Sequence, residues 1–214
     1  MGQMGILCRL RTAVSVLVWK NNKGEMMIHD AKAIEERLLS LQERWDEVMH
    51  ISANTVRHAG RAITAMHAGN LKEAKETLAE IEKNIKKLKK IEKGFEYYSL
   101  QAHQEYVEAY SLYSILKTGA IPTQEALKEG EAPYILGLLD VVGELKRESL
   151  ESLRKHEVTK AEKYYKLMVE IHDSMLPMRF ANSIVPDLRK KQDTARIQIE
   201  NTASDLLTFS KVLR

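Results

Sequence analysis

Apolar residues recur at steps of three and four along most of the chain from about residue 30, the pattern of helices with one buried face. The first predicted helix runs to a stop at Gly69, and its stripe is Ile34, Leu38, Leu41, Trp45, Val48 and Ile51. Asn70 can cap a second helix, which ends at Gly94. A third helix covers about residues 95–117.

The remaining sequence adds four more helical pieces. They are a short turn in TQEALK, a helix that Pro133 opens at its first position, one over about residues 159–175 and a last one over about 187–213. Alternating β-branched runs are scarce, which argues against a sheet. The pattern therefore predicts an all-α fold, a seven-helix antiparallel bundle.

Composition and the N-terminus add limits on partners and compartment. A net charge of +3 permits an anionic partner without demanding one, and the single cysteine, Cys8, excludes an intrachain disulfide, which fits a cytoplasmic protein. The apolar run over residues 13–19 lacks a signal cleavage site and is too short to span a bilayer, so no membrane partner is expected. We expect an N-terminal extension of uncertain role over residues 1–25 and a single helical domain over residues 26–214.

Four carboxylates stand where apolar helical residues are expected. Glu105 and Glu108 continue the inward stripe of the third helix, in line with Leu112. The helix after Pro133 is apolar almost all round except for one line, which is Gly137, Asp140, Glu144 and Arg147. Burying a carboxylate is costly unless a cation compensates, so the acids indicate a site.

The acid pairs can meet if the two helices pack side by side, and together they would suit a hard divalent cation. Oxygen ligands favour Mg²⁺, with Mn²⁺ as a possible substitute, and such a cation can activate a water for phosphoryl transfer. The alternative is that the acids pair with basic residues such as Arg57 or Arg147, or face water. Spacing alone leaves both interpretations open.

The segments QEYVEAYSLYSILKTG and PYILGLLDVVGELKRESLESL resemble the translin superfamily, and within it the translin-associated factor X branch. The resemblance runs over about residues 30–212 and includes the order of the helices. It implies a translin-type helical fold, assembly into a hollow homo-oligomer (an octamer in the family), binding of single-stranded RNA and possibly single-stranded DNA, and Mg²⁺-dependent endoribonuclease activity.

The resemblance also gives the acids roles. It implies that Glu105, Glu108 and Asp140 are catalytic metal-binding residues and that Glu144 is a fourth metal ligand. In the eukaryotic complex only one of two related subunits has these acids. Here one chain carries the whole set, so an active homo-oligomer is expected.

Three basic residues are candidates for contacts with nucleic acid. Arg57 and Arg61 lie one turn apart on the first helix, and Arg147 follows Glu144 on the acid-bearing helix. They could hold phosphates near the metal, or they could be ordinary surface charge.

Two rival functions remain. One is a non-catalytic single-stranded DNA- or RNA-binding or scaffold protein of the same family, in which the acids only organise the core. The other is a di-iron helical bundle, because Glu47 and His50 form one Glu-x-x-His step; such centres need a second step, which the sequence lacks.

Overall fold

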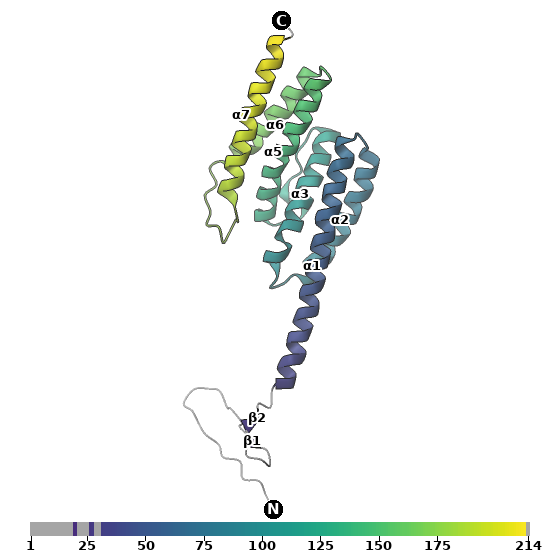
Figure 1. Ribbon diagram of the computed structural model, residues 1–214, viewed down its shortest axis with the longest axis vertical. Coiled ribbons are helices and arrows are strands. Elements are labelled where there is room, and N and C mark those ends of the chain that lie inside the picture. The colour runs from purple at the N-terminus through teal and green to yellow at the C-terminus, as the bar shows by residue number, and fades with distance from the viewer. Residues whose placement is uncertain (1–18, 21–25, 28–30, 213–214) are drawn as a thin grey trace, which may run out of the picture. The chain divides into compact units, whose positions relative to one another are not determined.

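The computed structural model describes residues 19–20, 26–27 and 31–212, and its chain forms two units that meet between Asp46 and Glu47. In the first unit, β1 (Trp19–Lys20) pairs antiparallel with β2 (Met26–Met27), with Trp19 opposite Met27. Helix α1 (Ala31–His67) begins there and continues into the second unit (Figure 1). Cys8 and residues 21–25 lie outside the described residues, so the interpretation of the extension stays a prediction.

Helices are the only regular elements among the described residues of the second unit. After α1 come α2 (Leu71–Ile91), α3 (Glu96–Thr118), α4 (Gln124–Leu127), α5 (Glu131–Arg154), α6 (Val158–Met175) and α7 (Leu188–Val212). The predicted all-α fold of seven helices is therefore confirmed, and among the described residues the only strands are the two-residue β1 and β2. Within the part of the chain that the structure describes, no helix combines the length and the apolar character needed to cross a membrane.

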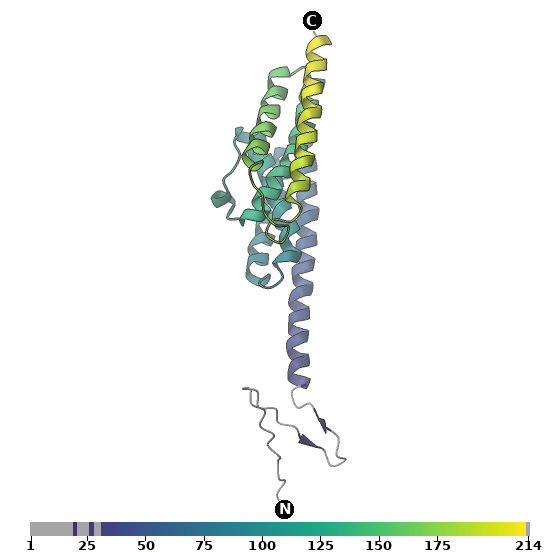
Figure 2. The same ribbon diagram turned by 90° about the vertical axis from the view of Figure 1, so that its left-hand side faces the viewer.

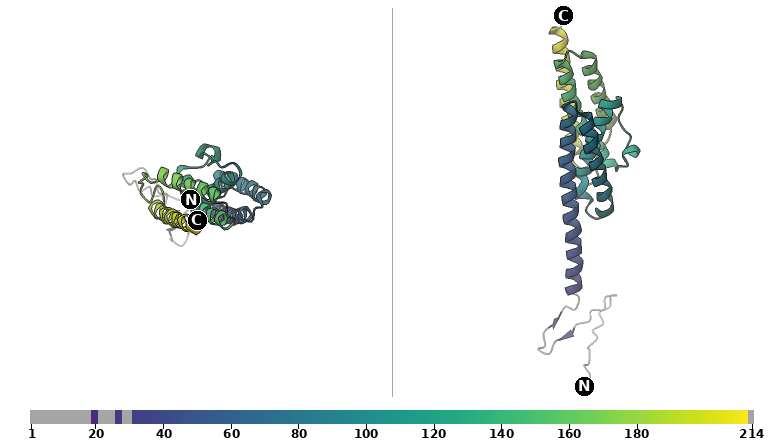
Figure 3. Two further views of the ribbon diagram at one scale, coloured as in Figure 1. Left: turned by 90° about the horizontal axis from the view of Figure 1, so that it is seen from above. Right: turned by 90° about the vertical axis from the view of Figure 1, so that its right-hand side faces the viewer.

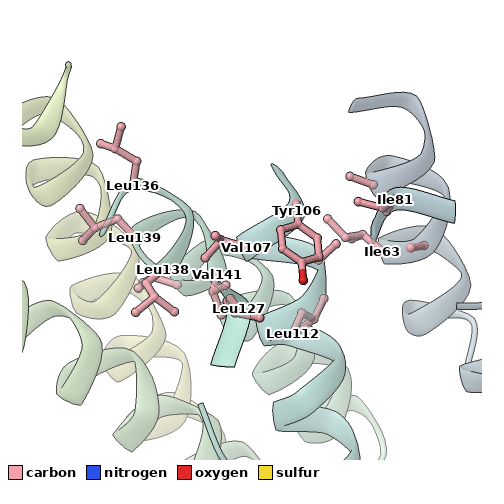
Figure 4. Close-up of a cluster of buried hydrophobic side chains, with 14 of the residues drawn as sticks. Ile63, Ile81, Tyr106, Val107, Leu112, Leu127, Leu136, Leu138, Leu139 and Val141 are labelled. Carbon is pink, nitrogen blue, oxygen red and sulfur yellow. The ribbon is translucent and has the colours of Figure 1, made fainter. Parts of the chain in front are cut away.

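Helix α5 packs against three other helices, which explains why it is apolar almost all round. It contacts α3, α6 and α7, while α2 covers the other side of α3 (Figures 2 and 3). Leu136, Val141, Val142 and Leu145 of α5 are almost completely buried. Figure 4 shows part of this core, with Val107 of α3 and Val141 of α5 among its side chains.

Helices α3 and α5 begin at the same end of the unit and run in the same direction. His103, in the second turn of α3, bonds Glu129, which lies just before α5. The connection through α4 brings the chain back from the end of α3 to this point, and Gly119 allows the turn because it adopts a φ of 77°. The two acid-bearing helices are therefore parallel neighbours, a pairing that the predicted antiparallel arrangement did not include.

The helix ends follow the predicted signals with one correction. The Asn70 side chain accepts a hydrogen bond from the Glu73 amide, as expected of a cap. Pro133 was expected at the first position of its helix, but α5 begins at Glu131, which makes Pro133 the third residue. The position is still tolerated, because the first four amides of a helix have no partner within it.

A buried charged network joins the end of α2, the start of α3 and the segment before α5. His103 bonds Glu129 and Glu92, both at 2.8 Å, and Lys89 pairs with Glu129 at 2.9 Å. Burial alone would lower the pKa of His103, but the bonds to Glu129 and Glu92 raise it to about 9. The imidazole is therefore charged at neutral pH, and it fixes the end of the unit where α3 and α5 start.

Replacing His103 with glutamine is expected to lower the free energy of unfolding by about 3 kcal/mol at pH 7, because two buried carboxylates lose their shared cation. A raised histidine pKa stabilises the fold below the unfolded value near 6.5, and that contribution is lost as the pH rises through about 9. Urea denaturation at pH 7 and pH 9.5 should therefore show a smaller difference between wild type and variant at the higher pH. Replacing exposed His50 with glutamine is the control, and an equal loss in both variants would contradict the assignment.

Candidate functional site

The two acids of α3 lie on its buried side and differ in their surroundings. Glu108 is only 9% exposed, and no hydrogen bond or ion pair reaches its carboxyl from the residues that the structure describes. Burial, with the charges of Asp140, Glu105 and Glu144, raises the pKa of Glu108 to about 9. Glu105 is half-buried, and burial raises its pKa as well, although a hydrogen bond from Gln101 opposes the shift. Glu108 is thus a buried carboxyl with no direct hydrogen-bond or ion-pair partner among the described residues, and only the charge of Lys191 opposes the rise of its pKa.

The acids of α5 lie opposite and each has a cation. Both Asp140 oxygens accept hydrogen bonds from Lys191 Nζ of α7, and Gln104 of α3 donates to Asp140 Oδ2 at 2.6 Å. Glu144 is bonded to His67 Nε2, at the end of α1, and His67 Nδ1 lies 2.6 Å from Glu148. Hydrogen bonds to Glu144 and then Glu148 raise the pKa of His67 to about 9, so its ring is cationic at neutral pH.

Gly137 is what lets the two acid-bearing helices approach closely. A Cβ atom at this position would lie 2.6 Å from the Gln104 carbonyl oxygen and 2.7 Å from Val107 Cβ, both on α3. These separations are far below van der Waals contact, so only glycine fits. Because Gly137 precedes Asp140 by three residues on the same face, the close approach brings the α5 acids against the α3 acids. The four carboxylates therefore form one electrostatically coupled group.

The donor chemistry of this group fits a hard divalent cation, but the side chains do not form a finished coordination shell. Among the described residues, no three acidic, histidine or cysteine side chains are arranged to hold a metal ion. The reason is visible at Asp140 and Glu144, whose carboxylates are turned to Lys191 and His67. Glu105, Glu108, Asp140 and Glu144 would hold a cation after these two side chains turn toward α3.

The predicted nucleic-acid contacts divide into two sets. Arg147 lies one helical turn after Glu144 on α5, and it lines a surface pocket of about 490 Å³ together with His67, which bonds Glu144. Arg57 and Arg61 are exposed on α1, and Arg57 donates a hydrogen bond to Asn54. They precede His67 by ten and six residues, or roughly 15 and 9 Å along the helix axis. The structure thus places Arg147 near the acids and the other two farther along α1.

The structure does not support the di-iron interpretation, because its Glu-x-x-His step faces away from the helical core. Glu47 and His50 are both exposed on α1, and His50 bonds Asn54 within the same helix. A di-iron bundle needs these side chains to project inward. The motif therefore lies outside the helical core.

The most important cation of the site was missed at the level of sequence. Lys191 was not singled out, although it continues the line of buried Leu188 and Ala195 on α7. A charged residue in an apolar stripe is the same signal that reveals the acids. His67 carries no such signal, since its role depends on how the end of α1 meets α5.

The fold and the site together place the chain among all-α proteins that carry an acidic site between two parallel helices. Residues 41–202 match the Translin family, and the chain belongs to this family. An uncharacterised protein of Methanocaldococcus jannaschii, MJ0175, is 35% identical over 173 residues, which are 79% of this chain and 78% of the relative.

Solved structures give the same fold. The complex of AfC3PO with duplex RNA has a TM-score of 0.79 and 28% identity, and AfC3PO solved as a crystal structure has a TM-score of 0.78 and 30% identity; each match covers 86% of this chain and 97% of the other. Apo-NeC3PO has a TM-score of 0.76 and 26% identity over 86% of this chain and 98% of the other. The family resemblance expected from the acid-bearing segments is therefore confirmed.

Proposed function

We propose that this protein is a Mg²⁺-dependent endoribonuclease, active also with Mn²⁺, that acts within a homo-oligomer. The observation that carries the proposal is the buried, unpartnered carboxyl of Glu108, placed beside Glu105 and facing Asp140 and Glu144. Burying such a group in its ionised form costs several kcal/mol unless a cation compensates it, and without one the carboxyl keeps its proton. A divalent cation held by the four acids would remove this cost.

In this proposal the acids bind the metal ion and the arginines bind the RNA. Glu105, Glu108 and Asp140 would hold the cation with Glu144, and when bound it would lower the pKa of a water and neutralise charge on the phosphate. Arg147, with Arg57 and Arg61 farther along α1, would contact the RNA backbone through charge, without reading its sequence. These contacts position the strand against the acids.

The comparisons and the exposed surface support RNA binding in an assembly. The AfC3PO relative was solved with duplex RNA, and we extend RNA binding to this chain, with single-stranded RNA as the expected substrate and single-stranded DNA as a possible ligand. On α1, Ile34, Leu38 and Leu41 are 42%, 58% and 44% exposed, which is typical of association surfaces. A mass measurement in solution would test the octamer that the family implies.

Cleavage of labelled RNA, single-stranded and duplex, with Mg²⁺ or Mn²⁺ tests the activity. Glu105→Gln and Asp140→Asn are each expected to reduce the rate roughly 100-fold, because each removes a ligand whose charge stabilises the transition state. Glu162→Gln on the exposed side of α6 is the matched control and should cleave like wild type. Unchanged cleavage in both site variants would refute the assignment.

One observation favours the non-catalytic alternative. Asp140 and Glu144 are already neutralised by Lys191 and His67, so half of the acid set has cations of its own. In that case the chain would be a nucleic-acid-binding scaffold whose acids organise the core. Tight RNA binding with no metal-dependent cleavage by the wild type would support this function over the nuclease.

A further inference from the structure

Lys191 occupies the carboxylate that the divalent cation would need. Its ammonium bonds both oxygens of Asp140 and so lies where a cation shared by these oxygens would bind. Two cations at one carboxylate repel each other, so metal binding at Asp140 requires the ammonium to leave. Lys191 and the metal are therefore competitors for the same group.

The structure provides a place for the displaced ammonium. A pocket of about 280 Å³ adjoins Asp140, and its polar lining comes from Asp187, Lys190, Lys191, Thr194 and Gln198. The Lys191 side chain is 23% exposed, and its flexible four-carbon stem can turn toward this space. Lys190 and Gln198 bring donors that suit a phosphate, whereas the Thr194 hydroxyl already donates to the Lys190 carbonyl. Asp187 and Asp140 are the opposing charges of the lining.

An ion pair of this kind is poorly explained by stability alone. Lys191 lies on the line of Leu188 and Ala195, where an apolar residue would pack. A partly buried pair often stabilises a fold no more than apolar residues of similar size would. The position of this charge in an apolar line therefore points to a role beyond packing.

Resting on the proposed nuclease function, we infer that Lys191 is an exchangeable counter-ion of the site. It holds Asp140 while no metal is bound, yields that carboxylate to the divalent cation, and then contacts an RNA phosphate in the adjoining pocket. Lys191 is in this sense a positioning residue. Lys191 thereby couples metal binding at Asp140 to the binding of the RNA strand. The affinity for the metal and the affinity for RNA can be measured separately.

Mn²⁺ titration of the full chain, followed by electron paramagnetic resonance, tests the competition without relying on activity. Lys191→Met is expected to bind Mn²⁺ roughly 10-fold more tightly than wild type, since one competing charge is gone. Lys191→Arg keeps the charge and should stay near the wild-type affinity. Lys166→Met, at an exposed position of α6, removes the same charge elsewhere and controls for net charge.

RNA cleavage at saturating Mn²⁺ tests the second part of the inference, the contact between Lys191 and an RNA phosphate. Lys191→Met is expected to raise KM for RNA roughly 10-fold, because a phosphate contact is lost, and circular dichroism should show that it remains folded. Affinity for Mn²⁺ no tighter than in Lys166→Met would overturn the competition, and an unchanged KM would overturn the phosphate contact. If the wild type binds no Mn²⁺, the proposed nuclease function itself falls, and this inference with it.

Discussion

Replacing Glu108 with glutamine is expected to raise the free energy of unfolding at pH 7 while strongly reducing metal-dependent cleavage. The pKa of the Glu108 carboxyl rises from its ordinary value of 4.5 to about 9 on folding, so the metal-free fold keeps a proton that the unfolded chain has released. For a carboxyl with a raised pKa, stability falls as the pH rises from 4.5 toward 9, by about 1.4 kcal/mol per pH unit. Glutamine has the same shape and no charge, so a gain of about 1–3 kcal/mol is expected.

Urea denaturation in EDTA at pH 5 and pH 8 measures this effect. The advantage of Glu108→Gln over wild type should be small at pH 5 and larger at pH 8, whereas Glu162→Gln should show no such trend. Cleavage should fall roughly 100-fold in Glu108→Gln. A gain in stability together with a loss of activity is the trade-off expected of a residue kept for function, and a variant no more stable than wild type at pH 8 would contradict it.

Replacing Gly137 with alanine is expected to have the second large effect, a decrease of about 1–3 kcal/mol in the free energy of unfolding. The added Cβ would meet the Gln104 carbonyl oxygen at 2.6 Å and Val107 Cβ at 2.7 Å, and the first of these is backbone that cannot turn away. Helices α3 and α5 must then separate. Their acids separate with them, so metal binding should weaken even in the molecules that remain folded.

Gly60 offers a matched control, because it also lies inside a helix but a Cβ there would meet nothing within 4 Å. Alanine has the higher helix propensity, so Gly60→Ala should stabilise the fold by about 0.5–1 kcal/mol. Urea denaturation of both variants, with Mn²⁺ titration below the transition, gives the comparison. The same small gain in Gly137→Ala as in Gly60→Ala would show that the helices do not need this close approach.

The helices and the acids could be predicted from sequence because both depend on local periodicity. The stripe through Glu105 and Glu108 and the line through Asp140 and Glu144 follow from residue spacing alone, and the structure confirms that Glu108 is buried. What spacing could not give is which helices become neighbours. Gly137 was visible in the acid line, but its meaning depends on the backbone of α3, which lies about 30 residues earlier.

The two cations of the site, Lys191 and His67, show what could not be predicted from the sequence. Lys191 reaches Asp140 across 51 residues and His67 reaches Glu144 across 77, and such pairs are created only by the packing of α7 and α1 on α5. Lys191 could have been suspected from its place between Leu188 and Ala195. His67 could not, since a histidine in the last turn of a helix is ordinary.

The parallel arrangement of α3 and α5 separates two kinds of change in chain length. Residues gained or lost in the connection through α4 before Glu129 leave the bond between Glu129 and His103 in place, and with it the alignment of the carboxylates. A residue inserted between Gly137 and Asp140 would instead turn both α5 acids by roughly 100° about the helix axis, away from α3. Length variation among functional relatives should therefore collect in the connection and avoid the four residues from the glycine to the aspartate.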